Sequence, residues 1–492
     1  MRMDKVKEFI QSLVGIVWGW PELLPLMVII LLGTGIFVTF RLRWIQLFRI
    51  GHAFQVIRGT YDNPQDQGDI NHFQALSAAL SATVGIGNIA GVATAIYYGG
   101  PGALFWMWIT AVFGMALKFS EATLAVSLRR IHADGSASGG PMYYIEKGLG
   151  ARWKPLAVAF AAFAIISSMG TGNSIQAFTC SDQILSEFKQ ALPAQHSLLQ
   201  QIQFLGIPVE PIRLITGVVL ASLVAMVILG GIKRIGKVAA RLAPFMALVY
   251  IVSALFILLM NAGRIIPTFT MILNEAFQPR AELVGFAGGG FLLFLNTVVW
   301  GVKRGLFSNE AGQGSAPIAH AAAKTNEAAR EGAVAMIGPL IDTLIICSLT
   351  GLVILSTNSH EVIVDGGRLN GSPLTALAFK TGLAPLFPWG DKIITFAVFL
   401  FAISTAISWS YYGDRSAEYL LGERAIKPYK IIYVIAHFIG AIVSLEIVWG
   451  FGDIALGLMA IPNLIALIAL SGRVKNIAND YFSRENEWQR FK

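Results

Sequence analysis

Two glycines and an asparagine interrupt one apolar run of the chain at its middle. The run is long enough to cross a bilayer, and Gly85, Gly87 and Asn88 lie close to its centre. In hydrocarbon every peptide N–H and C=O needs a partner, so a helix unwinds at that depth only where its free polar groups line a cavity. We therefore predict that this turn binds a solute or an ion, as expected of a carrier.

Glycine at this turn allows a second interpretation. It lacks a β-carbon, so a ligand can approach the main chain closely. The spacing of Gly87 and Gly91 is also typical of a contact between two membrane helices. The residues alone leave both interpretations open.

The composition places the chain in a membrane. Of 492 residues, 55% are hydrophobic and 13% charged, and the mean hydropathy is +0.63, which is too apolar for a soluble globule. The net charge of +8 comes from basic residues in short loops between apolar runs, as the positive-inside rule describes, so we expect no nucleic-acid partner. The N-terminal residues contain no cleavage site of the A-x-A kind, which argues against a removed signal peptide.

The pattern of reactive residues argues against an enzyme. The seven histidines are scattered, and no H-E-x-x-H or paired-cysteine spacing is present. Cys180 and Cys347 lie in or beside apolar runs and are interpreted as packing residues. We expect no cofactor.

Hydropathy predicts an all-α membrane protein with about eleven transmembrane helices. If the chain alternates sides, one set of loops holds most of the Lys and Arg residues, which places the N-terminus outside and the C-terminus in the cytoplasm. The apolar runs lie near residues 22–40, 73–98, 102–128, 155–180, 211–232, 236–261, 284–302, 333–356, 393–413, 431–449 and 454–471.

Ten of these spans can form two sets of five with opposite orientations. The glycines at 288–290 would then interrupt the first helix of the second set, as Gly85 and Gly87 interrupt that of the first. The predicted units are an N-terminal helix and linker (1–72), a first repeat (73–261), an inverted second repeat (262–471) and a cytoplasmic tail (472–492).

Several motifs of the chain lie at residues 75–91, 99–103, 138–145, 305–312 and 341–344. In this order along the chain they strongly resemble those of the alanine/glycine:cation symporter family of prokaryotic amino acid carriers. The resemblance implies a leucine-transporter-like fold, a cytoplasmic (inner) membrane location and sodium-coupled uptake of a small neutral amino acid. A proton-coupled carrier of the same fold, or an ion channel, is the alternative, and a monomer would suffice.

The resemblance and the chemistry of a zwitterion together indicate substrate residues. Amides at 85–87 would face the carboxylate with the positive end of a helix dipole. A buried Gln176 could hydrogen-bond the amino acid, or it could bridge helices. The expected substrate-binding residues are Thr83, Gly85, Ile86, Gly87, Asn88, Gln176, Phe291 and Trp409.

Sodium is a hard cation that prefers oxygen ligands. The resemblance implies hydroxyl ligands from Ser404 and Thr405, with Phe401 in the same segment, and carbonyl ligands from Ser81 and Val84. Without it, a Ser-Thr pair in a membrane helix more often bonds to its own backbone or to a neighbouring helix.

Two further features concern ionisable residues inside spans. Asp342 lies well inside the run 333–356, where it could serve a cation, a proton or a gate, or accept hydrogen bonds from the loop at 305–315. Lys118 and Glu121 are spaced for an ion pair on one helix.

Two loop segments are expected to act as gates. The segment 301–314 is expected to close the inner path, and residues 358–392 are expected to close the outer one.

Overall fold

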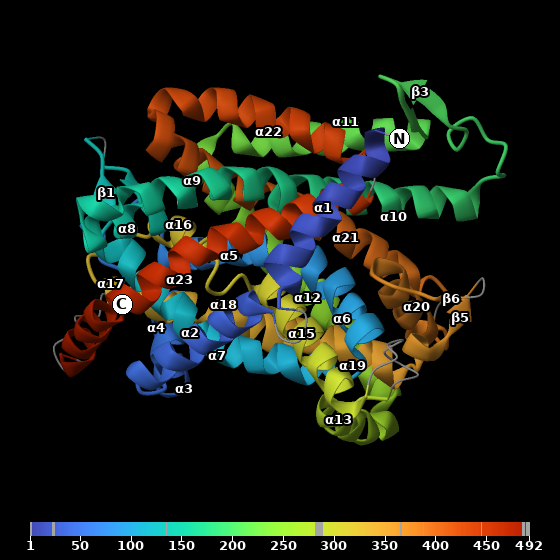
Figure 1. Cartoon of the computed structure of the whole chain (residues 1–492), viewed down its shortest axis with the longest axis horizontal. Helices are drawn as coiled ribbons and strands as arrows, with labels where there is room; N and C mark the ends of the chain where they lie inside the picture. The colour runs from blue at the N-terminus through green and yellow to red at the C-terminus, as the bar shows by residue number, and fades with distance from the viewer. Residues whose placement is uncertain are drawn as a thin grey trace.

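The computed structural model describes residues 2–21, 25–133, 135–280, 289–364, 367–386, 388–443, 445–484 and 488. This part of the chain is mainly helical, with three two-stranded antiparallel hairpins. Several long helices run roughly along the longest axis of the molecule, and the hairpins lie at their ends (Figure 1).

In the first part of the chain, long helices alternate with short π- and 3-10-helical pieces. Its elements are α1 (Arg2–Gly19), α2 (Leu26–Arg41), α3 (Ile45–Phe48), α4 (Ile50–Ile57), α5 (His72–Thr83), η1 (Gly87–Gly91), α6 (Val92–Gly99), α7 (Ala103–Ser127), β1 (Arg130–Ile131), β2 (Ala137–Ser138), α8 (Pro141–Leu149), η2 (Ala151–Trp153), α9 (Lys154–Met169), η3 (Gly170–Ser174) and α10 (Ile175–Ala191).

The second part repeats this mixture of long and interrupted helices. Its elements are β3 (Ile202–Phe204), β4 (Ile207–Val209), α11 (Pro211–Ile228), α12 (Gly231–Met260), α13 (Ala262–Phe277), α15 (Gly290–Asn309), α16 (Ala316–His320), α17 (Ala328–Ala335), α18 (Ile337–Pro339), η4 (Leu340–Cys347), α19 (Ser348–Ser356), η5 (Ser359–Glu361), β5 (Ile363–Val364), β6 (Gly367–Arg368), α20 (Ser372–Leu383), α21 (Gly390–Leu421), η6 (Glu423–Ala425), α22 (Ile426–Gly440) and α23 (Leu445–Ser483).

Each of the eleven predicted apolar runs contains a helix, although several bounds differ. The helices α21 and α23 extend well beyond the predicted runs, and α23 continues across the predicted start of the tail at residue 472. The helices α1, α13 and α20 were not predicted as spans. In the described residues, seven helices are long and apolar enough to cross a membrane, or eight if the bent pair α5 and η1–α6 is one span.

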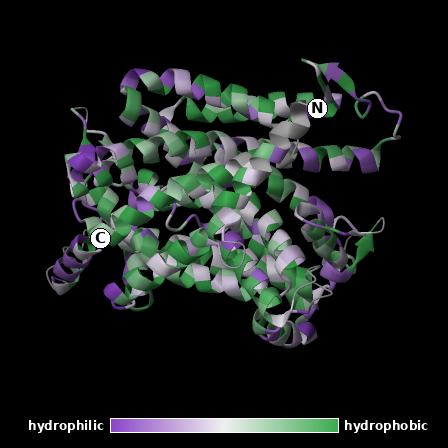
Figure 2. Ribbon diagram, in the orientation of Figure 1, coloured by the Kyte–Doolittle hydropathy of each residue, from purple (hydrophilic) through white to green (hydrophobic). Residues whose placement is uncertain are grey.

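Hydrophilic residues gather at the two ends of the long helices. One end carries β1, α8 and the end of α23, and the other carries the end of α10, whereas the middle is mostly hydrophobic (Figure 2). This distribution is that of a membrane protein with polar caps on an apolar middle.

A second interruption follows α15. The expected interruption at 288–290 lies partly outside the described residues: Gly288 is not described, Gly289 is the N-cap of α15 and Gly290 is its first residue. The helix is unbroken up to Asn309, and Glu310 then adopts a left-handed conformation (φ 53°). Polar and glycine residues up to Ser315 separate α15 from α16.

Three π-helical segments interrupt the long helices. They are η1 after the break in α5, η3 between α9 and α10, and η4 between α18 and α19. A π-helical turn carries one extra residue, and such turns occur often at functional sites. Here η1 contains Asn88, η3 ends two residues before Gln176, and η4 contains Asp342.

Candidate substrate and cation site

The first helix break is built by local hydrogen bonding. A capping box between Asn71 and Gln74 starts α5, which ends where Val84 adopts an extended conformation (ψ 92°). The direction of the chain then changes by 52° before α6. The predicted break is therefore confirmed at the expected residues.

Asn88 holds the break in place. Its Oδ1 accepts a hydrogen bond from the Gly85 amide at 2.8 Å, and its own amide donates to the Gly85 carbonyl at 3.2 Å. The Gly85 amide, expected to face a substrate carboxylate, is thus capped by a side chain. These two hydrogen bonds fix the direction of the turn even when no ligand is bound.

The glycines are needed because two other segments come very close. A β-carbon at Gly85 would lie 2.6 Å from Oγ1 of Thr405, and one at Gly87 would lie 3.3 Å from Cδ1 of Phe307. Contacts under 3.0 Å require a neighbour to move, so Gly85 brings α5 and α21 together. Close packing and a polar site coexist at this turn.

A small cavity of about 10 Å³ lies at the centre of these breaks, which is roughly the space of one water molecule. Two buried oxygens, Oε1 of Gln176 and Oγ1 of Thr405, have no hydrogen-bond partner in the described structure. Both lie beside Gly85, within 3.7 Å and 2.6 Å of its ideal β-carbon. The lining residues are Ala82, Thr83, Gly85, Ile86, Gly87, Thr171, Gln176, Phe307, Glu310, Thr405 and Trp409.

One wall of the cavity is a tryptophan held by a carboxylate. Nε1 of Trp409 donates to Oε1 of Glu310 at 2.9 Å, and the Ser315 hydroxyl donates to Oε2 at 2.5 Å. The indole packs against Gly172, where a β-carbon would lie 2.2 Å from the Trp409 side chain. Glu310 was not predicted as a site residue, although an acid next to Asn309 and Gly312 in an apolar region is a recognisable signal.

Phe291 does not reach the cavity. It lies at the start of α15 with 65% of its surface exposed, which contradicts its predicted place in the side-chain pocket. The error follows from placing the second break at 288–290. With the break after Asn309, Phe307 takes the position at the cavity.

The expected sodium ligands lie where α5 meets α21. The Ser404 hydroxyl lies 3.2 Å from the Ser81 carbonyl and 3.1 Å from that of Phe401, and the Ser81 hydroxyl donates to the Ser404 carbonyl at 3.1 Å. The next residue, Thr405, presents its unpartnered Oγ1. Four of the five expected residues are thus adjacent, and the fifth, Val84, ends α5 beside them.

Asp342 and Asn88 form a separate network behind the break. Asn88 Nδ2 donates to Asp342 Oδ1 at 2.6 Å, and the hydroxyls of Ser308 and Thr343 each donate to Oδ2 at 2.7 Å. Neither Asn88 nor Asp342 lines the cavity. The network joins η1, α15 and η4, so it couples the two interrupted helices.

A family model for the sodium:alanine symporter family matches residues 3–491. The chain is 46% identical over 462 residues to the sodium/alanine symporter AgcS of Methanococcus maripaludis, with 93% of each chain covered. The chain belongs to the sodium:alanine symporter family. This symporter is therefore a multi-span membrane transporter and not an enzyme.

Two other comparisons agree with this assignment. The symporter is 33% identical to the amino-acid carrier protein AlsT of Bacillus subtilis, covering 93% of this chain and 90% of AlsT. Its structure resembles the crystal structure of MhsT in complex with L-phenylalanine, with a TM-score of 0.57 and 13% identity, over 84% of this chain and 93% of MhsT. At that identity the likeness shows a shared fold.

At its predicted cytoplasmic end the symporter is closed by main-chain contacts. The segment before α5 pairs with the turn after α16, through Asp69 N to Ala322 O at 2.8 Å and Lys324 N to Ile70 O at 2.7 Å. The Arg129 guanidinium donates to four carbonyls in these segments. They are those of Gln67, Ala321, Ala323 and Thr325, at 2.7–2.9 Å.

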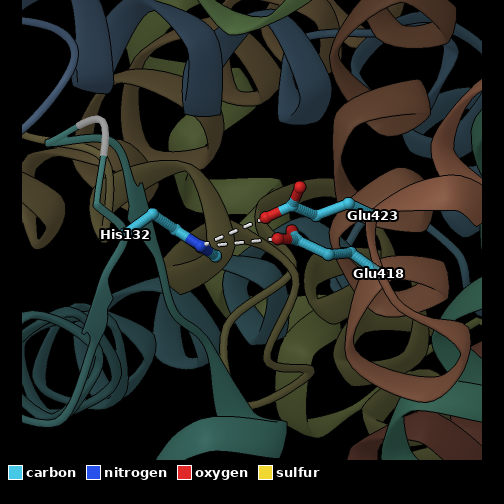
Figure 3. Close-up of side chains that lie close together, drawn as sticks. All are labelled: His132, Glu418 and Glu423. Carbon is cyan, nitrogen blue, oxygen red and sulfur yellow. Dashed lines mark ion pairs between the residues drawn. The ribbon is translucent and has the colours of Figure 1, made fainter.

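A charged cluster joins two other elements of the symporter at this end (Figure 3). His132, after β1, lies with Nε2 3.4 Å from Oε1 of Glu418 and with Nδ1 3.6 Å from Oε1 of Glu423. The Arg415 guanidinium also pairs with Glu418, at 2.6 Å. We interpret these residues as an ion-pair cluster that ties the β1–β2 hairpin to the end of α21, beside a surface cavity of about 610 Å³.

Proposed function

We propose that this protein takes up a small neutral amino acid of the alanine and glycine class together with sodium, by alternating access. One observation carries the proposal. The interrupted helix α5 and the helix α21 share a small cavity lined by buried oxygens and, directly beside it, the cluster of oxygens at Ser81, Phe401 and Ser404. A solute and its driving ion would thus bind next to one another.

The cavity offers both kinds of group that a zwitterionic amino acid requires. The Glu310 carboxylate and Oε1 of Gln176 would accept from the ammonium group, and the Thr405 hydroxyl would donate to the carboxylate beside residues 85–87. Trp409 and Phe307 would enclose the substrate side chain. Because discrimination by one methylene is only about 1–3 kcal/mol, we expect a range of small substrates.

The sodium ion would take oxygens from Ser81, Val84, Phe401, Ser404 and Thr405. The Ser404 hydroxyl already lies between two carbonyls, and Thr405 belongs to both the cavity and this group. A ligand shared by both sites provides a direct physical link between sodium and substrate affinity. Asn88 and Asp342 would not contact the substrate. They would couple a change in the conformation of η1 to η4.

Alternating access would open one end of this closed arrangement at a time. At the predicted outer end, Thr375 of α20 donates to the Ile89 carbonyl of η1 at 3.0 Å, so α20 would form part of the outer lid. The inner end would open by separating the segment before α5 from the turn at 321–325. We propose two inverted five-helix repeats, 73–261 and 262–471, in a bacterial inner membrane, with a monomer sufficient for transport.

Labelled alanine uptake into vesicles containing the purified protein tests this function. We expect accumulation with an inward sodium gradient, and exchange of labelled alanine against an internal unlabelled pool. Uptake driven by a proton gradient without sodium would instead indicate the proton-coupled alternative. Uptake without exchange would indicate a channel.

A further inference from the structure

A basic pocket lies where α2 and α3 meet the end of α23. It has a volume of about 220 Å³, and it lies toward the end of the molecule that also carries β1 (Figure 1). The Arg49 guanidinium lies 4.3 Å from the ring centre of Phe482, so the pocket joins two parts of the chain that are far apart in sequence. The described lining residues include no Asp or Glu. They are Arg41, Leu42, Arg43, Ile45, Phe48, Arg49, Ala478, Asn479 and Phe482.

A tight turn between α2 and α3 brings the first two arginines to this pocket. Arg43 and Trp44 both adopt left-handed conformations, with φ of 53° and 58°, which side chains other than glycine rarely tolerate. The Trp44 amide donates to the Thr39 carbonyl at 3.0 Å and closes the turn. Backbone of this kind is concentrated at functional sites, because the structure around it must hold it in place. The turn keeps Arg41 and Arg43 on the same pocket.

The positive charge of the pocket is not balanced by neighbouring acids. Arg41 and Arg43 have exposed side chains and no carboxylate partner in the part of the chain that the structure describes. The Arg41 guanidinium lies 5.9 Å from the ring centre of Phe37, a contact that leaves its charge in place. The acid nearest to the lining in sequence, Asp480, pairs with Arg484 at 2.9 Å. A hollow with cations of one sign favours an anionic ligand.

Large apolar side chains are exposed directly beside these arginines. Phe40 precedes Arg41 and is 63% exposed, and Phe48, which lines the pocket, is 77% exposed. The predicted span 22–40 ends just before Arg41, so the pocket would lie where the hydrocarbon of the bilayer meets the headgroups. At this depth exposed aromatic rings contact acyl chains, whereas guanidinium groups reach the headgroups.

We propose that this pocket binds the headgroup of an anionic phospholipid from the cytoplasmic leaflet. Arg41 and Arg43 bind its phosphate, and Phe40 and Phe48 contact its acyl chains. A guanidinium group can donate two parallel hydrogen bonds to a phosphate, and basic pockets on the cytoplasmic side of membrane helices suit such headgroups. The exposed aromatic side chains favour a lipid over a free phosphate ion, which needs no apolar neighbour. This inference does not depend on the proposed transport function.

The test measures binding of labelled phosphatidylglycerol to the purified full-length protein in detergent. We expect saturable binding that unlabelled phosphatidylglycerol displaces. Phosphatidylcholine, which has no net charge, and inorganic phosphate should each compete at least about tenfold more weakly. Equal competition by phosphatidylcholine would show that charge is not recognised. Equal competition by inorganic phosphate would show a site for the free ion. Either result would overturn the proposal.

Two double variants with the same change in charge locate the site. Arg41→Gln with Arg43→Gln should weaken phosphatidylglycerol binding about tenfold or more, because it removes both phosphate contacts. Arg234→Gln with Arg424→Gln removes two exposed arginines outside the pocket and should leave binding within about twofold. Equal binding by the two double variants would overturn the proposal.

Size-exclusion chromatography checks that each double variant is folded. All four substituted arginines are exposed, so we expect a single peak at the position of the natural protein. If the pocket variant does not fold, the competition by phosphatidylcholine and inorganic phosphate in the natural protein decides.

Discussion

Gly85 shows how a single residue determines the site. Without a side chain it lets the Thr405 hydroxyl and the Gln176 side chain approach the main chain from two other helices. The capping of its amide by Asn88 keeps the turn open towards the cavity side. Sequence alone indicates such a turn because glycine and asparagine rarely interrupt an apolar run without a reason.

Gly85→Ala should lower alanine uptake at least about tenfold, because its β-carbon would lie 2.6 Å from Thr405 Oγ1 and overpacking of this kind costs about 1–3 kcal/mol. Sodium-driven uptake into vesicles measures the effect. Gly33→Ala in α2 is the matched control, since its β-carbon would meet nothing within 4 Å. Equal uptake by both variants would show that the close approach at Gly85 is unimportant.

Some residues of the site could be placed from sequence and others could not. Thr83, Gln176, Thr405 and Trp409 were predicted and line the cavity, because the family resemblance assigned them to the right helices. Glu310 was missed and Phe291 was wrong for the same reason. A left-handed backbone conformation at residue 310 cannot be recognised from the hydropathy of the sequence, whereas a run of glycines can be seen in it.

At the scale of elements, the site depends more on where helices are interrupted than on where they begin and end. The apolar runs predicted the helices, since length and hydropathy suffice for that. The extra residues of η1, η3 and η4 have no signal in composition, because a π-helical turn depends on which neighbour satisfies the displaced carbonyl. Thr375 does so for Ile89 of η1, from a helix far away in sequence.

Arg129→Gln should loosen the predicted cytoplasmic closure, because it removes a guanidinium that donates to four carbonyls around α5 and α16. Loss of one such charged hydrogen bond costs about 1.5–3 kcal/mol. A cysteine at buried Ser77 should then react about tenfold faster with a permeant maleimide, above the background of Cys180 and Cys347. Arg130→Gln, on the exposed neighbouring residue, serves as the control. An unchanged rate in Arg129→Gln would show that this contact does not close the inner path.

At the scale of the whole molecule, polar ends and an apolar middle define how the protein sits in a bilayer. Figure 2 shows hydrophilic residues at the end that carries β1 and α8 and at the end of α10. Motif order predicted the fold correctly, since the likeness to MhsT shows a shared architecture. The inverted repeat and the orientation stay predictions.

A cysteine at Leu205, which is 86% exposed between β3 and β4, should react with an impermeant maleimide in intact cells. One at Arg152, at the opposite end, should react only after permeabilisation, because the loops rich in Lys and Arg face the cytoplasm. The reverse pattern would contradict the predicted orientation.

The central claim is that the break in α5 binds a substrate and its driving ion side by side. Two binding sites that share Thr405 must influence each other reciprocally. The most direct measurement is the affinity of the purified protein for labelled alanine with and without sodium, together with its sodium affinity with and without alanine. We predict that each ligand raises the affinity for the other by the same factor, about tenfold or more. An alanine affinity that sodium leaves unchanged would contradict the account.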